Sequence, residues 1–391
     1  KKSERDVERW QNVFHALNKN HLIPIVRIAT DFDALGFWQK PADTDAQDWA
    51  NFLNKLNWPT KNRYVQIYNE VNRAGEWGNL VDAANYAKEL EKTITALKAK
   101  NADFFVLNAP LDLALTTSEN SLDASTFLQT MEATVPGIFN KLDGWASHSY
   151  PNPDFSASPY RAGRTSIVGY KWEVAQIASF VPGKNLPVFI TETGWKRGNE
   201  TGTGRTANQI SAYYKIAFET IWNDEKIAAV APFLLNFNEP LFEAFSFKTN
   251  KEDKTHYEFY STIQNLQKVK GEPKREDIAD ISNLDIPNTV INKSPKRIRL
   301  VIKNGGNYIW NTKDGFKIEL TGTNLEVSEA NFDTDEIYPG QTVKVEIKVK
   351  SLAEGSLPFT LKVFNGDKIL EKKELAFESK TYVSFIFGHI Q

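Results

Sequence analysis

Two glutamates stand where apolar runs give way to polar segments, and they are the residues of this sequence best suited to acid–base chemistry. Glu70 follows YVQIY and has Asn69 beside it, and Glu192 follows PVFIT. Two carboxyl groups that share a site push their pKa values apart, so one can hold a proton while the other stays ionised. Such a pair can protonate one atom of a substrate and attack its neighbour, although charge alone does not decide which glutamate has which role.

The elements that must position the two glutamates recur about every 40 residues. Six short apolar runs have the length of strands: 23–29, 64–68, 104–109, 144–150, 187–193 and 230–237. Helical patterns fill most of the intervals, as at 46–57, 80–100 and 205–224. Strands and helices that alternate at a fixed spacing predict an α/β fold with a parallel sheet covered by helices. The size favours a (β/α)8 barrel, or TIM barrel.

The barrel domain is predicted to occupy residues 1–268. A closed barrel of this kind has eight strands, so we expect its first two strands to lie upstream of residue 1. Residues 5–20 are expected to form a helix that leads into the first visible strand. Residues 269–296 are polar and carry three prolines, which predicts a linker. Residues 297–391 alternate between apolar and polar side chains, which predicts a C-terminal antiparallel β-sandwich, immunoglobulin-like in style.

In such a barrel the carboxyl ends of the strands meet at one face, where the chemistry is done. We expect Glu70 and Glu192 to face each other there. The other polar and aromatic residues that we place at these ends are Arg27, Asn69, His148, Tyr150, Trp195 and Asn236. Two carboxyl groups with hydrogen-bonding neighbours match the requirements of glycosidic bond cleavage. One protonates the leaving oxygen, and the other attacks or stabilises the anomeric carbon.

Three motifs carry a resemblance to a known class of enzymes: IYNEVN (67–72), WASHSYPNP (145–153) and PVFITETGW (187–195). Together they resemble the motifs of clan A glycoside hydrolases, which are retaining (β/α)8-barrel glycosidases of the cellulase and β-xylosidase kind. The resemblance covers about residues 5–268. It implies that Glu70 is the acid/base and Glu192 the nucleophile. It also implies that Asn69 binds the sugar 2-hydroxyl, that Tyr150 steadies the nucleophile, and that His148 is a subsite donor.

Several other residues have two interpretations. Three tryptophans could each offer a face to a sugar ring or simply pack: Trp38, Trp77 and Trp195. Arg27 could bind substrate or act as a structural ion-pair partner of a glutamate. Relatives usually carry Trp on the last strand, whereas this sequence has Asn236 and Phe237 in PFLLNFNEP, so the sugar is not predicted. The sandwich could bind glycan or act as a spacer, and its aromatic candidates are Tyr308, Trp310 and Tyr338.

The resemblance to retaining enzymes leads to three expectations about the site. The carboxyl groups of Glu70 and Glu192 are expected to lie about 5–5.5 Å apart, because inverting enzymes need a wider gap for a water molecule. Tyr150 is expected within hydrogen-bond reach of Glu192. Glu70 is expected to have the raised pKa, because it must stay protonated beside an ionised neighbour.

The composition excludes several function classes. The net charge is −2 with no polybasic face, which argues against nucleic acid as a partner. Cysteine is absent and the five histidines are scattered, so we predict no metal site and no cofactor. No apolar run is long enough to span a membrane. An extracellular or cell-surface location is expected from the enzyme class alone, because no signal in the sequence indicates it.

The sequence therefore predicts a retaining glycoside hydrolase that cleaves a β-linked oligo- or polysaccharide by double displacement. The alternative from another class is a non-catalytic carbohydrate-binding or cell-surface protein built on a glycosidase-derived barrel. Both glutamates are present, which favours the enzyme.

Overall fold

The computed structural model describes residues 1–198, 204–237, 239–249, 255–267 and 273–387, and the chain divides into two compact units. The first unit comprises Lys1–Asp6, Ile25–Lys55 and Asn62–Gly271, and the second comprises Val7–Pro24, Leu56–Lys61 and Glu272–Gln391. The first unit combines helices with parallel strands, and the second is rich in antiparallel strands. The prediction of a mixed α/β chain with a strand-rich C-terminal region is therefore confirmed.

The described residues of the first unit form six parallel strands in two sheets of three. Their bounds are β1 (Ile25–Ile28), β2 (Arg63–Ile67), β3 (Phe104–Leu107), β4 (Trp145–Ser147), β5 (Val188–Thr193) and β6 (Ile227–Pro232). The strand order is β1-β2-β3 in one sheet and β4-β5-β6 in the other. A parallel bridge between Leu107 and Gly144 continues the series from β3 to β4.

The last of these strands lies earlier in the chain than the sequence indicates. The apolar run predicted a strand over 230–237, but β6 ends at Pro232. The next amide, that of Phe233, still donates to the carbonyl of Thr193, at 2.8 Å. The amide of Leu234 then turns to the carbonyl of Phe245, at 3.2 Å, so the chain leaves the sheet at this point.

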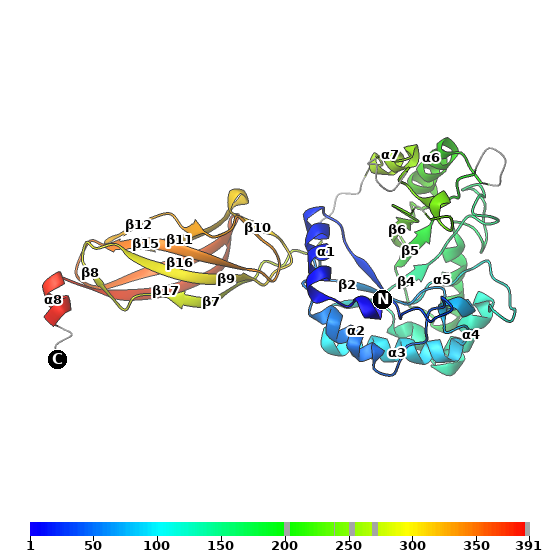
Figure 1. Ribbon diagram of the computed structural model, residues 1–391, viewed down its shortest axis with the longest axis horizontal. Helices are drawn as coiled ribbons and strands as arrows, with labels where there is room; N and C mark the ends of the chain where they lie inside the picture. Colours follow the sequence, from blue (N-terminus) through cyan, green and yellow to red (C-terminus); the bar gives the residue numbers. More distant parts are fainter. Residues whose placement is uncertain (199–203, 238, 250–254, 268–272, 388–391) are drawn as a thin grey trace. The chain divides into compact units, whose positions relative to one another are not determined.

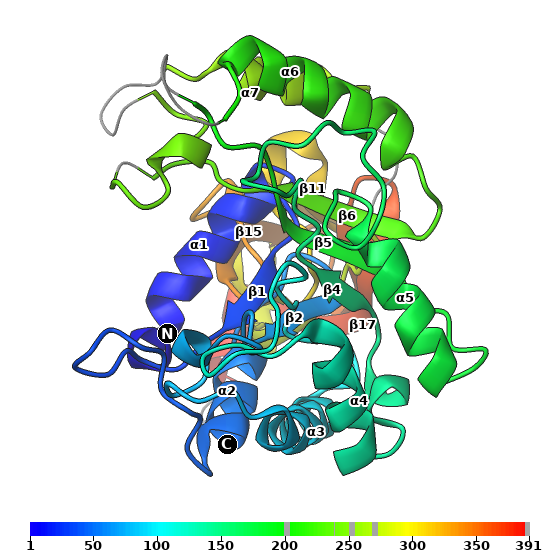
Figure 2. The ribbon, with the colours of Figure 1, turned by 90° about the vertical axis from the view of Figure 1, so that its right-hand side faces the viewer.

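Helices follow the strands and lie around their outside (Figure 2). Their bounds are α2 (Asp45–Asn54), α3 (Ala83–Lys100), α4 (Ala124–Thr134), α5 (Gly169–Phe180), α6 (Ala207–Ile216) and α7 (Glu258–Gln264). Short helical turns are η1 (Lys2–Glu4), η2 (Ala74–Glu76), η3 (Ile138–Lys141), η4 (Ala217–Ile221) and η5 (Glu243–Phe245). In α3, Tyr86, Leu90, Ile94 and Leu97 are buried at helical spacing, so one stripe of the helix faces inward.

All six strands contribute side chains to one small apolar cluster. Its members are Ile25, Tyr64, Phe105, Leu107, Ala146, Phe189 and Ala229. The rings of Tyr64 and Phe189 lie 5.5 Å apart, and those of Phe105 and Phe189 lie 5.7 Å apart. The six strands therefore enclose a common interior that side chains fill.

The described part of the second unit contains helix α1 (Val7–Lys19), two large sheets of mostly antiparallel strands (Figure 1) and the small sheet β10-β14. One sheet has the order β12-β15-β9-β7, with β13 also paired to β15, and the other has the order β11-β16-β17-β8. The main strands are β7 (Ala279–Asp285), β8 (Thr289–Ile291), β9 (Lys296–Asn304), β11 (Phe316–Gly322), β12 (Leu325–Val327), β13 (Asn331–Phe332), β15 (Thr342–Ser351), β16 (Gly355–Asn365) and β17 (Lys368–Lys380). Smaller elements are β10 (Trp310–Asn311), η6 (Thr312–Asp314), β14 (Glu336–Ile337) and α8 (Tyr382–Phe387).

Both sheets of the second unit share one core. Ile298, Leu300 and Ile302 of β9 belong to the same buried cluster as Leu361 and Val363 of β16. Alternate residues of each strand are buried, as the period-two pattern predicts. The immunoglobulin-like topology remains a prediction.

The segment predicted as a linker, 269–296, is largely part of the second unit. Residues 268–272 lie outside the described residues, but β7 pairs with β9 and β8 pairs with β17. Ile281 and Leu284 of β7 pack against the shared core, which gives this polar segment enough apolar contact to form a strand.

Helix α1 also groups differently from the prediction, which placed residues 5–20 with the barrel. Phe14 is buried with its ring 4.9 Å from that of Trp58, and the side-chain amide of Asn18 donates to the carbonyl of Asn307 at 2.9 Å. The ring of His15 lies 4.6 Å from that of Tyr338. These contacts join α1 to the second unit.

The shared core of the second unit leads to a prediction about the stability of that unit. Ile347 is 1% exposed, so Ile347→Ala removes buried methyl groups and should lower the free energy of unfolding of this unit by about 2–4 kcal/mol. Lys348→Ala, on the outer face of the same strand, should change it by less than about 0.5 kcal/mol. Urea unfolding followed by circular dichroism measures both, and equal midpoints for the two variants would contradict the assigned core.

Candidate functional site

A cavity of about 1020 Å³ lies in the first unit at the carboxyl ends of its parallel strands. Six of the residues predicted for the site line it: Arg27, Asn69, Glu70, His148, Tyr150 and Glu192. They come from the ends of β1, β2, β4 and β5 or from the segments that follow. The strand ends that the sequence repeat singled out therefore meet at one cavity.

Glu70 is held in an unusual backbone conformation just after β2. Tyr68 has a φ of 69° and Glu70 a φ of 33°, in the left-handed region that residues other than glycine seldom adopt. Such strain costs on the order of 1–3 kcal/mol and gathers at functional sites. The ring of Tyr68 is buried and lies 5.2 Å from that of Trp77, which holds the turn in place.

The carboxyl group of Glu70 has two basic partners. Nδ1 of His148 lies 2.8 Å from one carboxylate oxygen, and Nε of Arg73 lies 3.1 Å from the other. Arg73 is also bonded to Asp112, which fixes its position. Burial alone would raise the pKa of Glu70, but the hydrogen bond from His148 and the charges of His148 and Arg73 outweigh it and lower the pKa. The expectation of a raised pKa for Glu70 is therefore wrong for the free site.

The pKa of His148, the hydrogen-bond partner of Glu70, is shifted in the opposite direction. Its side chain is fully buried, which by itself lowers the pKa of the imidazole. The charges of Glu192 and Glu70 and the hydrogen bond to Glu70 outweigh burial and raise that pKa. The opposite directions of the two pKa shifts favour an ionised Glu70 beside a protonated His148.

Glu192, on β5, has a hydrogen-bond donor and a cationic side chain beside its carboxyl group. The hydroxyl of Tyr150 donates to Oε2 at 3.2 Å, which is the hydrogen bond expected from the sequence. A guanidinium nitrogen of Arg27 lies 3.7 Å from Oε1, so the proposed structural ion pair is also present. Burial and the charges of Glu192 and Glu70 raise the pKa of Tyr150 well above its usual value, so its hydroxyl remains a donor.

A glycine just after Glu192 lets the ends of β5 and β6 approach each other. Gly194 has a φ of 157°, and a Cβ added there would lie 2.7 Å from the hydroxyl of Tyr214 and 3.0 Å from the carbonyl oxygen of Phe233. Any side chain would therefore force these groups apart. The glycine of the TETGW motif has a steric role in shaping the cavity wall.

One nitrogen limits how far apart the two glutamates can be. Nδ1 of His148 lies 2.8 Å from Oε1 of Glu70 and 3.7 Å from Oε2 of Glu192. These two oxygens can be no farther apart than the sum of the two distances. That limit falls at about 6.5 Å, the lower end of the range for inverting enzymes, and the expected value of about 5–5.5 Å remains a prediction.

Charged residues that the sequence reasoning missed complete the lining. Besides the predicted Glu70, Glu192 and Arg27, the charged residues on the cavity wall are Glu76, Asp112, Arg73, Arg164 and Lys196. Burial, followed by the charge of Glu70, raises the pKa of Glu76 to about 7. Arg73 and Glu76 lie three and six residues after Glu70, so reading past the strand end into RAGEW could have found them.

Three predicted residues are not among those that line the cavity. Trp77 is fully buried and its indole donates to Asn85 at 3.0 Å. Trp195 is 2% exposed and donates to the carbonyl of Ala157 at 2.8 Å. Both tryptophans therefore pack and offer no face to a sugar. Asn236 is exposed and lies four residues beyond the end of β6, whereas Phe233, the first residue after β6, lines the cavity.

The third tryptophan with two interpretations, Trp38, does line the cavity. Its ring lies 4.0 Å from that of Phe32, which is 44% exposed and lines the cavity too. Together they form an aromatic rim on the segment that follows β1.

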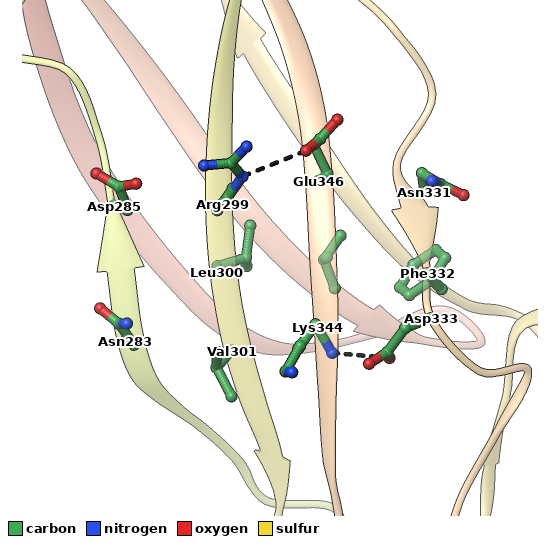
Figure 3. A pocket seen from close by; sticks show the side chains of 11 residues that line it. Asn283, Asp285, Arg299, Leu300, Val301, Asn331, Phe332, Asp333, Lys344 and Glu346 are labelled. Atoms are coloured by element: carbon green, nitrogen blue, oxygen red, sulfur yellow. Dashed lines mark hydrogen bonds and ion pairs between the residues drawn. The ribbon is translucent and has the colours of Figure 1, made fainter.

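A second cavity, of about 420 Å³, lies on the second unit and is drawn in Figure 3. Charged side chains on its wall face other groups of the same sheet. Nε of Arg299 lies 3.3 Å from Glu346, and the backbone amide of Lys344 donates to Asp333 at 2.9 Å (Figure 3). Its lining contains no pair of carboxyl groups placed like that of the first unit, so we regard the first cavity as the candidate site.

The aromatic candidates of the second unit are occupied by other contacts. Trp310 is fully buried and its ring stacks on that of Phe316 at 4.8 Å. The guanidinium of Arg275 lies 4.3 Å from the ring of Tyr308, and Tyr338 packs on His15. These three rings do not form a common surface for a glycan.

Neither a metal-binding cluster nor a membrane-spanning helix is found in the described part of the chain. Those residues include no group of three or more His, Cys, Asp or Glu side chains suited to a metal ion. None of their helices has both the length and the apolar character needed to cross a membrane.

No family model and no curated protein matches the chain. One similar solved structure is a family 39 glycoside hydrolase from Bacteroides cellulosilyticus WH2, at 14% identity over 88% of this chain and 71% of that one, with a TM-score of 0.44. Another is AbfB, a family 51 α-L-arabinofuranosidase from Bifidobacterium longum, at 10% identity over 86% and 78%, with a TM-score of 0.42. A third, BuGH86wt in complex with neoagarooctaose, has 12% identity over 92% and 69%, with a TM-score of 0.46. Similarity this weak carries no argument, so the case for a function rests on the site.

Glu173, on α5, is a buried acid close to the strand that carries His148. It is completely inaccessible to solvent, and burial raises its pKa to about 7, with the polar groups of Ser147 and Trp145 acting in the opposite direction. The folded chain therefore holds this proton more tightly than the unfolded chain does. The contribution of Glu173 to stability is greatest at low pH and is lost as the pH rises from about 4.5 to about 7.

Glu173→Gln should remove this pH dependence. The loss of folding free energy between about pH 5 and pH 8 should be smaller in the variant than in the wild type by on the order of 3 kcal/mol. Urea unfolding at several pH values measures the difference, and other titrating groups cancel because both proteins share them. Parallel pH profiles for the two proteins would show that Glu173 is not held protonated.

Proposed function

We propose that this protein is a retaining glycoside hydrolase that cleaves a β-linked glycan by double displacement. The observation that carries the proposal is the contact of a single buried imidazole nitrogen with two carboxylates from different strands, within one cavity. The upper limit of about 6.5 Å that this contact sets on the distance between one oxygen of each carboxylate is compatible with a retaining geometry.

Glu192 acts as the nucleophile. The donated hydrogen bond from Tyr150 and the nearby charge of Arg27 stabilise its carboxylate and hold it in place. It attacks the anomeric carbon as the bond from that carbon to the leaving oxygen breaks. The product is a glycosyl ester on Glu192, which makes that side chain neutral.

Glu70 acts as the acid and then as the base. Its proton comes from His148, along the hydrogen bond of 2.8 Å, because the pair stores its proton on the imidazole. Glu70 passes that proton to the leaving oxygen. In the second step it accepts a proton from the water that attacks the anomeric carbon and frees Glu192.

The fold also supports the assignment to the (β/α)8-barrel glycosidases. Six parallel strands with helices outside, and with one interior cluster drawn from every strand, suit six consecutive units of a (β/α)8 barrel. The aromatic rim formed by Phe32 and Trp38 suits an oligo- or polysaccharide, because sugar rings pack on flat apolar faces. An extracellular or cell-surface location belongs to the same proposal.

One observation favours the rival function, a non-catalytic carbohydrate-binding protein. Each glutamate lies beside an arginine, Glu70 beside Arg73 and Glu192 beside Arg27, as structural ion pairs would. Such ion pairs can serve a structural purpose alone, without any part in proton transfer. The two functions therefore differ in whether these residues support turnover.

Substitution of the two glutamates separates the two functions. Wild type should release chromophore from at least one member of a panel of aryl β-glycosides, and Glu192→Gln should abolish this release. Glu70→Ala should be slow, and azide should partly restore its turnover, because azide attacks the glycosyl ester without needing a base. Glu225→Gln, at an exposed position, is the matched control and should keep wild-type rates. Equal rates in the wild type and Glu192→Gln, or products of inverted configuration, would refute the mechanism.

His148 should set the upper pH limit of activity. In the wild type the proton of the pair is lost only as the pH passes the raised pKa of His148. His148→Gln should lower kcat/KM at least tenfold and move the alkaline limb of its pH profile to lower pH, because Glu70 alone must then hold the proton. An unchanged alkaline limb would show that the stored proton is elsewhere.

A further inference from the structure

The cavity of about 420 Å³ on the second unit, here called the sheet cavity, has a lining that the proposed mechanism does not use (Figure 3). It lies over four neighbouring strands of one sheet, β7, β9, β15 and β13. Leu300 and Val345 of this sheet are buried in the core of the unit, so the residues that alternate with them point to the outer face. The sheet cavity therefore opens on the outer face of the sheet.

A row of polar side chains crosses all four strands at the sheet cavity. The strand register places Asp285 of β7 opposite Arg299 of β9. It places Glu346 of β15 between Arg299 and Asn331 of β13. Neighbouring strands lie about 4.8 Å apart, so a row across four strands extends for about 14 Å. The row thus offers carboxylate, guanidinium and amide groups over a length that suits a short oligosaccharide.

A second row lies beside the first and includes an apolar position. Asn283 is opposite Val301, Val301 is opposite Lys344, and the backbone amide of Lys344 donates to the carboxylate of Asp333 at 2.9 Å. The short side chain of Val301 stands between longer polar neighbours and gives the sheet cavity an apolar floor. Binding sites for small ligands combine apolar surface with a few placed polar groups, and a sugar presents both apolar C–H groups and hydroxyls.

The protein itself uses only part of this polar lining. Nε of Arg299 lies 3.3 Å from Glu346. No hydrogen bond or ion pair joins the side chains of Asn283, Asp285 and Asn331 to the other residues drawn in Figure 3, and all three residues are exposed. An amide both donates and accepts hydrogen bonds, and a carboxylate accepts them. These three side chains can therefore bind hydroxyl groups of either polarity.

The charges that line the sheet cavity nearly cancel. Three of the lining residues are acidic and two are basic: Asp285, Asp333 and Glu346, and Arg299 and Lys344. A site for a nucleic acid or another polyanion needs an excess of positive charge. The lining therefore favours an uncharged ligand rich in hydroxyl groups.

We propose that the sheet cavity is a non-catalytic binding site for a neutral glycan, the polysaccharide that the first unit is proposed to cleave. The glycan lies across the strands, with hydroxyl groups bonded to the two rows and an apolar ring face on Val301. The inference rests on the proposed glycosidase function for the choice of ligand, and it goes beyond that function by giving the second unit a binding role. A chain that holds a polysaccharide at two sites retains it better than either site would alone.

The first test reads the floor of the sheet cavity directly and needs no turnover. The full chain with Glu192→Gln, which blocks cleavage, is labelled with ¹³C in its valine methyl groups. The signals of Val301, identified by their loss in Val301→Ile, should shift on addition of at least one of the β-linked hexasaccharides of xylose, glucose and mannose. Asp285→Ala should raise the apparent Kd at least tenfold. Signals that move with none of these sugars, or that move only with heparin, overturn the inference.

The second test compares two positions of one strand. In native gels that contain xylan, mannan or a soluble β-glucan, at least one polysaccharide should retard the full chain. Val301→Arg fills the floor with a long charged side chain and should weaken this retardation at least fivefold. Lys303→Ala, on the same outer face of β9 but not in the lining, is the matched control and should keep it.

Equal retardation of Val301→Arg and Lys303→Ala overturns the inference. Urea unfolding checks that both variants are folded, and Asp285→Ala, at an exposed position, repeats the comparison without disturbing the core.

These tests distinguish failure of the inference from failure of the glycosidase proposal. Shifts of the Val301 signals without turnover of any aryl glycoside by the wild type refute the enzyme and leave the binding site in place. Turnover without such shifts refutes the inference alone.

Discussion

The contact of His148 with both glutamates is the interaction on which the proposed chemistry depends. Its Nδ1 must reach Glu70, after β2, and approach Glu192, on β5, while His148 itself follows β4. Backbone pairing sets the relation of β4 to β5, with Ser147 opposite Ile190. The relation of β2 to β4 is indirect, because β3 lies between them and is joined to β4 by only an isolated bridge.

Buried amide side chains make up for the limited pairing between β3 and β4. Asn108 accepts from the backbone amide of Ala146 at 2.8 Å and donates to its carbonyl at 3.1 Å. Asn72 exchanges two hydrogen bonds of 3.0 Å with the backbone of Asp112. Asp112 in turn holds Arg73 beside Glu70. These side-chain amides therefore fix the position of one strand end relative to the next through hydrogen bonds. A single substitution at Asn72 or Asn108 would loosen the site.

The strand ends could be predicted from the sequence because they recur with a regular period. A repeat of about 40 residues places Glu70, His148 and Glu192 at or just beyond the carboxyl ends of three parallel strands, and parallel strands bring such points to one face. Arg73, Glu76 and Asp112 lie farther along the loops, where the chain follows no period. Their positions depend on turns and on bonds such as that between Asn72 and Asp112, which no local pattern reveals.

Local sequence patterns did not predict two other features, the strands β7 and β8 and the packing of helix α1. The alternation that marks β9 and β15 is weak in β7 and β8, so a polar segment with three prolines resembled a linker. The pattern of residues 5–20 correctly indicates a helix, but an amphipathic face does not say what it packs against. Phe14 meets Trp58 and Asn18 meets Asn307, contacts between residues too distant in sequence for any periodic argument to reach.

Trp77 connects the strained turn at Glu70 with the apolar interior. The sequence left it undecided between a sugar platform and packing, and the structure places it in the packing. Its ring lies 5.2 Å from that of Tyr68 and 5.5 Å from that of Tyr86, whose hydroxyl in turn bonds the carbonyl of Ile67 at 3.3 Å and the amide of Ala109 at 2.6 Å. Burial of a large aromatic ring contributes on the order of 2–3 kcal/mol, enough to offset the backbone strain at one or two residues. Trp77 does not line the cavity, but it holds the left-handed turn that presents Glu70 to it. The proposed chemistry therefore depends on Trp77 indirectly.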